Sequence, residues 1–269
     1  SASITEKQLA LEAGEAFEAG DYAWAAEKWE AAVKASENNP EATGVYLKNA
    51  AIAQQNIAVG HVNDASQSLR DLDRPAAITS FEKAREAALK AGEQGKELLE
   101  AVDQALEGLN KAKVKVGDLI PVTGGGDVKV TEAVNDEGVM GKFVTPGKPY
   151  DGQEVIIGRD GSFTPYDSPL VNDNVVLKNG TKLEITQRTS QGEPIFGRIG
   201  GQRVAITYGD DGSIGLTPHY KVGDTLQLEN GLKPKILEVN EHNQPTMVDI
   251  DGQRHSVVVD GNKLSFTPH

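Results

Sequence analysis

The stretch that decides the fold runs from Val222-Gly223-Asp224 to Phe266-Thr267-Pro268-His269, and the chain carries two earlier versions of it. These run from Val116-Gly117-Asp118 to Phe163-Thr164-Pro165-Tyr166 and from Val171-Asn172-Asp173 to Leu216-Thr217-Pro218-His219. A further marker lies between the two ends of each copy, as Gly152-Gln153, Gly201-Gln202 and Gly252-Gln253. Markers that recur in one order, about every 50 residues, indicate a repeated structural module. The sequence therefore predicts three β modules, over residues 113–168, 169–219 and 220–269.

The last copy shows what one module contains. Short apolar or alternating runs are separated by turn residues, which is typical of strands joined by hairpins. The expected strands cover residues 225–228, 234–239, 246–250, 256–259 and 264–266. Asp251-Gly252 and Asp260-Gly261 are dipeptides that supply the positive φ angles of tight hairpins. A five-stranded unit of this size, with a long first loop and a short final strand, resembles an SH3-like barrel. We expect three small barrels in a row; the alternatives are a β-trefoil and one continuous antiparallel sheet or solenoid.

The composition changes near residue 112. Before it the chain is rich in Ala, Glu, Leu and Lys, which favour helices. After it Val, Ile, Thr and Gly take over, together with Asn-Gly and Asp-Gly pairs, which favour strands and hairpins. We therefore expect a multidomain α+β protein, with an α-helical domain over residues 1–112 and an all-β remainder.

The helical part carries a recognisable spacing of small and aromatic residues, from Ala13-Gly14-x-x-Phe17 through Gly20-Asp21-Tyr22 to Ala25-x3-Trp29-x2-Ala32. Small residues let two antiparallel helices approach, while aromatic side chains fill the space between them. The pattern resembles a tetratricopeptide repeat. A looser second copy joins Tyr46-Leu47-x-Asn49-Ala50-Ala51 to Ala77-x3-Phe81-x2-Ala84. Between its halves, residues 59–74 form a polar insertion, either a loop or a short extra helix, and residues 95–111 are expected to form a capping helix.

The resemblance to tetratricopeptide repeats implies a concave helical face that holds a peptide or protein partner. Lys48, Asn49 and Gln55 are the candidate residues of that groove. Trp24 lies about 140° from Trp29 around a helix of 100° per residue. It either packs on a flanking helix pair or serves as an exposed anchor, because tryptophan is enriched at binding hot spots.

The remaining patterns predict no chemistry. The chain has no cysteine, and its net charge of −13 argues against binding nucleic acid through phosphates. The five histidines have no compact metal-ligand spacing. His219 and His269 occupy the repeat position of Tyr166, which favours packing or hydrogen bonding at a module boundary. The equivalent Asp118, Asp173 and Asp224 are each expected to fix a turn through their own backbone.

We therefore expect no catalytic, cofactor-binding or metal-binding residues. The expected function is that of a non-enzymatic adaptor or scaffold, with the bacterial cell envelope as a candidate location. The alternative is binding of cell-wall or other polysaccharide through the tandem β modules.

No run of apolar residues is long enough to span a membrane. The start at Ser1-Ala2-Ser3 fits cleavage by signal peptidase as well as a cloning remnant. The compartment is therefore left open, with the periplasm or exterior preferred to the cytoplasm, and the oligomeric state is not predicted.

Overall fold

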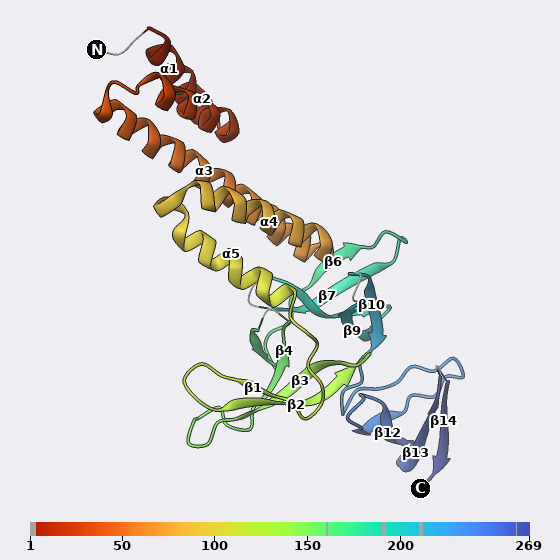
Figure 1. Ribbon diagram of the computed structural model, residues 1–269. Coiled ribbons are helices and arrows are strands. Elements are labelled where there is room, and N and C mark those ends of the chain that lie inside the picture. The colour runs from red at the N-terminus through yellow and green to blue at the C-terminus, as the bar shows by residue number, and fades with distance from the viewer. Residues whose placement is uncertain (1–3, 160, 190–191, 210–211, 262) are drawn as a thin grey trace. The chain divides into compact units, whose positions relative to one another are not determined.

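The computed structural model describes residues 4–159, 161–189, 192–209, 212–261 and 263–269. The chain divides into two compact units, Ser1–Asn110 and Lys111–His269. The first unit is helical and the second consists of β-sheets, as Figure 1 shows. Each unit is described by itself.

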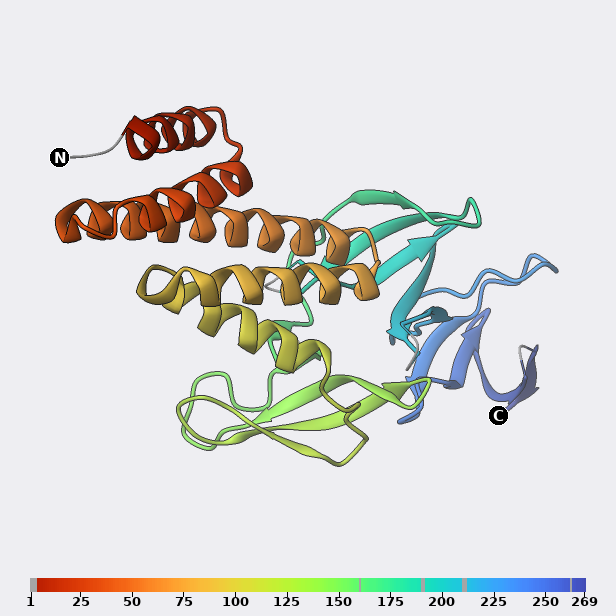
Figure 2. The ribbon, with the colours of Figure 1, turned by 45° about the horizontal axis from the view of Figure 1, so that its top comes forward.

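The helical unit contains helices that follow one another as antiparallel neighbours (Figures 1 and 2). They are α1 (Ile4–Glu18), α2 (Tyr22–Ala35), α3 (Pro40–Arg70), α4 (Arg74–Lys90), the short 3-10 helix η1 (Gly92–Gly95) and α5 (Lys96–Leu109). Asp21, Asn39 and Asp73 cap α2, α3 and α4, because each side chain accepts a hydrogen bond from the backbone N–H three residues later. These side chains satisfy backbone donors that have no partner inside the helix.

Helix α3 differs from the expected interrupted repeat. The polar segment at 59–74 is neither a loop nor a separate helix, since residues up to Arg70 continue α3 without a break. The reason is that Ala58, Ala65 and Leu69 still follow helical spacing, and all three are buried against α4 and α5. The helix ends where Leu72 adopts a φ of 62° and the N–H of Asp73 reaches the carbonyl of Ser68.

The core of the helical unit is built mainly from alanine. One cluster joins Ala16, Ala25, Ala26 and Ala53 of α1, α2 and α3, with Phe17 and Trp29 packed against it. A second cluster, around Phe81 and Val102, joins α3, α4 and α5. Trp29 also stacks on Tyr46 of α3 at 5.7 Å between ring centroids. Small side chains bring the helix backbones close, and the few aromatic rings fill the remaining space.

The β unit consists of antiparallel sheets, one for each repeat. The first module is β1 (Leu119–Pro121), β2 (Asp127–Val134), β3 (Glu137–Val144), β4 (Glu154–Ile157) and β5 (Phe163–Pro165). The second is β6 (Asp173–Val176), β7 (Lys182–Arg188), β8 (Pro194–Ile199), β9 (Gln202–Tyr208) and β10 (Ile214–Pro218). The third is β11 (Lys235–Val239), β12 (Pro245–Ile250), β13 (Gln253–Asp260) and β14 (Lys263–Pro268).

Within each sheet, sequential strands pair as neighbours, and in the described residues no ladder joins strands of different modules. A single continuous sheet, or a barrel shared by all repeats, would require such ladders. In the third module the expected first strand at 225–228 is reduced to one bridge between Thr225 and Lys235. The expected hairpin at Asp251-Gly252 is confirmed, because both residues have positive φ and Ile250 pairs with Gln253.

All modules share a β-bulge in the equivalent strand of their sheet, β2, β7 and β11. The register shifts just before Glu132 in β2, Gln187 in β7 and Glu238 in β11. A bulge adds one residue to one strand, so the next side chain changes face. Val128 and Val130 face the interior of the first module, and alternation alone would send Glu132 there as well. Because of the bulge, the side chain of Glu132 points away from the interior of its own module instead.

Beyond the bulge, the first two modules share a hydrophobic core. Val134, Val139, Met140 and Ile156 of the first module pack with Ile195, Phe196 and Ala205 of the second. Phe196, Ile156 and Ala205 are fully buried there. The third module keeps a core of its own around Leu226, Ile236 and Val248.

The continuity of α3 can be tested at Gly60. A Cβ at this position would meet no atom within 4 Å, so Gly60→Ala should stabilise the helical unit by about 0.5–1 kcal/mol. Gly60→Pro should cost about 3 kcal/mol or more, because proline removes a helical hydrogen bond and clashes with the preceding turn. Urea unfolding followed by tryptophan fluorescence measures both, since Trp24 and Trp29 are the only tryptophans. If both variants unfold like the unmodified protein, residue 60 lies in a loop.

Candidate functional site: the polar junction of the β modules

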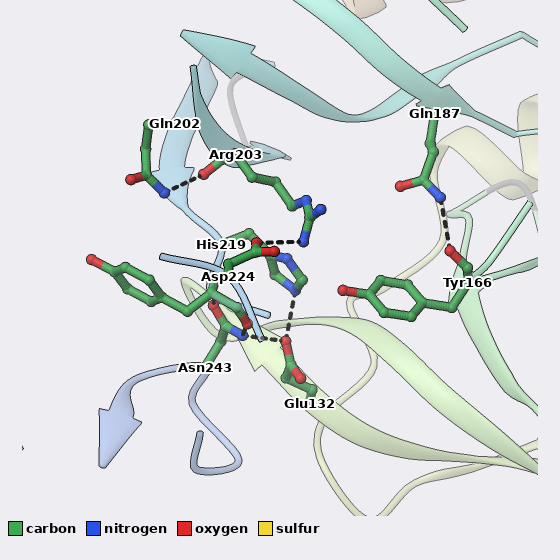
Figure 3. Close-up of polar contacts among 9 residues, drawn as sticks. Glu132, Tyr166, Gln187, Gln202, Arg203, His219, Asp224 and Asn243 are labelled. Atoms are coloured by element: carbon green, nitrogen blue, oxygen red, sulfur yellow. Dashed lines mark hydrogen bonds and ion pairs between the residues drawn. The ribbon is translucent and has the colours of Figure 1, made fainter. Parts of the chain in front are cut away.

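The carboxylate of Glu132 lies where the three modules meet (Figure 3). Its Oε1 atom is 2.8 Å from Nε2 of His219, which closes the second module. The same oxygen accepts a hydrogen bond of 2.7 Å from the side-chain amide of Asn243, in the β11–β12 turn of the third module. Because an ionised carboxylate only accepts hydrogen bonds, Nε2 of His219 carries the proton in this pair. One oxygen therefore links all three modules.

Asn243 holds the start of the third module in place. Its side-chain oxygen accepts from the N–H of Tyr220 at 2.6 Å, and its amide nitrogen donates to the carbonyl of Tyr220 at 2.8 Å. The residue has a φ of 55°, a left-handed conformation that asparagine tolerates better than most residues. Next to it, the carbonyl of Glu241 accepts from the N–H of Ala133 at 3.0 Å. The turn at 240–244 is therefore tied both to the first module and to Tyr220 at the start of the third module.

His219 is packed as well as hydrogen-bonded. Its side chain is only 1% exposed, and its ring lies 4.5 Å from that of Phe196 and 6.3 Å from that of Tyr166. The expectation of a boundary histidine is thus confirmed at this position. His269, at the same position of the third module, is exposed. The pairing of His219 with Glu132 joins the first module to the second.

Charged pairs surround this junction. Nη1 of Arg203, in the second module, lies 3.1 Å from the carboxylate of Asp224 in the third. The ammonium of Lys221 lies 4.6 Å from the ring centroid of Tyr166, close enough for a cation–π interaction. The carbonyl of Tyr166 accepts a hydrogen bond of 3.1 Å from the amide of Gln187. Burial raises the pKa of Tyr166 to about 12.

The expected turn is confirmed at two of the repeated aspartates, where the backbone N–H of Asp118 donates to the carbonyl of Lys115 and that of Asp224 to the carbonyl of Lys221, each at 3.0 Å. The carboxylate of Asp118 also accepts from the N–H of Lys115 at 2.9 Å. Asp173 pairs with Arg188 at 3.1 Å, and Asp224 pairs with Arg203. The second module supplies the arginine in both pairs, Arg188 for Asp173 and Arg203 for Asp224. Sequence reasoning found the equivalence of the three aspartates but missed their partners.

Two hollows lie beside the junction. One of about 240 Å³ lies between the second and third modules, where Arg198, Arg203, His219 and Asp224 line it. Another of about 490 Å³ is lined by Asn135, Tyr220 and Asn243, among others. Within the described part of the chain, no three histidine, aspartate or glutamate side chains gather where they could hold a metal ion.

The residues proposed from sequence for partner binding lie in the helical unit. Trp24 is 47% exposed on α2, and the ammonium of Lys28 lies 4.6 Å from its ring centroid. Lys48 is exposed on α3, whereas Asn49 and Gln55 are half-buried. At about 100° per residue, Lys48 and Gln55 share one face of α3, and Asn49 lies about 100° away from Lys48.

Comparisons with protein-family models, with curated proteins and with solved structures find no match to this chain. Among the helices that the structure describes, none combines the length and the apolar character needed to cross a membrane.

The junction predicts a selective loss of stability. Glu132→Ala leaves the buried Nε2 of His219 and the amide of Asn243 without their acceptor, at about 1–3 kcal/mol for each donor. Glu132→Gln should lose less, because its side-chain oxygen can still accept. Glu238→Ala is the matched control, since Glu238 occupies the same bulge position but is exposed. Hydrogen exchange of the β unit in dilute solution measures all three variants. Equal protection in Glu132→Ala and Glu238→Ala would contradict this role.

Tyr166 predicts a loss of stability at alkaline pH. Its pKa of about 12 lies above the value of about 10 in an unfolded chain, so the stabilisation is complete below pH 10 and is lost as the pH rises towards 12. Tyr166→Phe should therefore lose less unfolding free energy than the unmodified protein between pH 8 and about pH 11. Urea unfolding followed by circular dichroism at the two pH values gives the comparison. An equal loss in both proteins argues against a contribution from this hydroxyl.

Proposed function

We propose that this protein is a non-enzymatic adaptor whose helical unit binds a peptide or protein partner. In this proposal the helical unit is tetratricopeptide-like and the β modules are SH3-like. The antiparallel succession of α1 to α4, with small residues buried at their crossings, supports the first assignment. Small antiparallel sheets with a common bulge support the second.

A stripe along α3 carries the proposal. Residues at intervals of three and four share one face of a helix. Val45 and Val59 are 53% and 42% exposed, and between them lie Lys48, Ile52 and Gln55. We call these five residues the α3 stripe. At 1.5 Å per residue it is about 21 Å long.

Other faces of α3 are packed inside the helical unit. Tyr46, Ala53 and Ile57 face α2, while Ala58, Ala65 and Leu69 face α4 and α5. The stripe residues belong to none of these packed sets, and Val45, Lys48 and Val59 are exposed. Its exposed valines supply apolar contact, and Lys48 supplies a charge that favours an acidic partner segment.

The β unit would serve this adaptor as a rigid body. The Glu132 junction and the core shared by the first two modules tie the modules to one another. Location in the cell envelope is part of this proposal. Binding of cell-wall polysaccharide through the β unit is the alternative function, and the experiment below distinguishes it from binding of a peptide partner.

The test uses peptides selected against the full chain from a phage-displayed library. Val45→Ala and Lys48→Ala should each weaken the selected peptides by about tenfold, or about 1.4 kcal/mol. Leu89→Ala and Lys90→Ala on α4 are the matched controls, because Leu89 is 51% exposed and the Lys90 side chain 57%. Trp24→Ala tests the second candidate anchor. Fluorescence anisotropy of labelled peptides measures the dissociation constants.

Unchanged binding by both α3 variants, or an equal loss in the α4 controls, would contradict the assignment of the partner site to the α3 stripe. Sedimentation of the full chain with purified peptidoglycan, unaffected by any of these substitutions, would support the polysaccharide alternative instead.

A further inference from the structure

The ladders give each module the same four outward positions. The first position is the residue after the bulge, and the second is the residue that pairs with it on the next strand. The third is the residue that pairs with the second on the strand after that. The fourth is the residue that closes the module. In the first module they are Glu132, Met140, Ile156 and Tyr166. In the second they are Gln187, Phe196, Ala205 and His219. In the third they are Glu238, Met247, Ser256 and His269. We call these four positions the pairing face.

The first two modules use their pairing faces on each other. The bulge residue Glu132 reaches the closing residue His219, and the bulge residue Gln187 reaches the closing residue Tyr166. Met140 and Ile156 pack in one cluster with Phe196 and Ala205. The contacts are reciprocal, which is the property of an isologous interface around a twofold axis. The two modules therefore form an approximately twofold pair inside one chain.

The third module has the same face, and among the residues that the structure describes no other module pairs with it. Glu238 and His269 are exposed, and Met247 and Ser256 are half-buried. Val258, which follows Ser256 on the outward side of β13, is 58% exposed. The buried residues of this module, around Ile236 and Val248, lie on the other face of its sheet.

We propose that the pairing face of the third module binds the same face of a second copy of this chain. A twofold axis would bring the Glu238 carboxylate of one copy to the His269 imidazole of the other, and would do so twice. The internal pair already shows this contact between an acid and a histidine, at Glu132 and His219. The first two pairing faces occupy each other, so the matching free face is found on another copy.

The sequence of the third module also sets the strength of this contact. Thr246 and Ser256 stand where the first module has Val139 and Ile156, so less apolar surface is buried. Met247 and Val258 supply most of what remains. Small interfaces of this kind hold weakly, so the dimer should depend on concentration, with a dissociation constant on the order of 10–100 µM.

Sedimentation velocity of the full chain, from about 1 µM to about 1 mM, tests the proposal across this range. We expect a shift from monomer to dimer, which Met247→Glu abolishes by placing a charge near its own symmetry mate. Val176→Glu is the matched control, since Val176 is 65% exposed on β6 and lies outside the pairing face. Ser256→Ile, which restores the residue of the first module, should tighten the dimer about tenfold or more.

The acid and histidine pair is tested by exchange. Glu238→His and His269→Glu should each weaken the dimer, and the doubly exchanged chain should recover it, because the two partners are then again complementary. A chain that stays monomeric at about 1 mM overturns the proposal, whatever Ser256→Ile does, and leaves this face to solvent or to a different protein. A dimer that Met247→Glu and Val176→Glu affect equally overturns it as well.

Discussion

The β unit depends on where the carboxylate of Glu132 points. Its Oε1 atom accepts from His219 and from Asn243, so one residue of the first module fixes the second and the third. This position follows from the bulge before Glu132, which moves the side chain from the inner to the outer face of its sheet. Without the bulge, the carboxylate would lie against Val128 and Val130, where an unpaired charge is costly to bury.

The same bulge has a different outcome in each module, because the surroundings differ. Glu132 meets a buried histidine, Gln187 meets a backbone carbonyl, and Glu238 is exposed. The helical unit is packed differently, with alanine at the helix crossings and a few aromatic rings between the helices. Because α3 is long, it contributes buried residues to both hydrophobic clusters of that unit, and one of its faces is still exposed.

Local signals predicted much of this fold, and contacts between modules escaped them. Turn chemistry is local, so Asp251-Gly252 could be recognised from the sequence and has the expected geometry. The continuity of α3 was missed because its outer face at 59–74 is polar, while the buried Ala65 and Leu69 give only a weak apolar pattern. The junction was missed because alternation places Glu132 on the inner face. Aligning Glu132 with Gln187 and Glu238, all polar residues at the end of an apolar run, could have revealed it.

The alanine core of the helical unit has a consequence for how its sequence can drift. At fully buried positions such as Ala25, Ala53 and Ala77, any larger side chain must push two backbones apart, and the only smaller residue is glycine, which weakens helices. A conventional core of leucine and isoleucine can exchange one large residue for another of similar volume. This one has few neutral exchanges available. Substitutions in this unit should therefore accumulate on its solvent-facing positions, and the crossings should change least between descendants of the same gene.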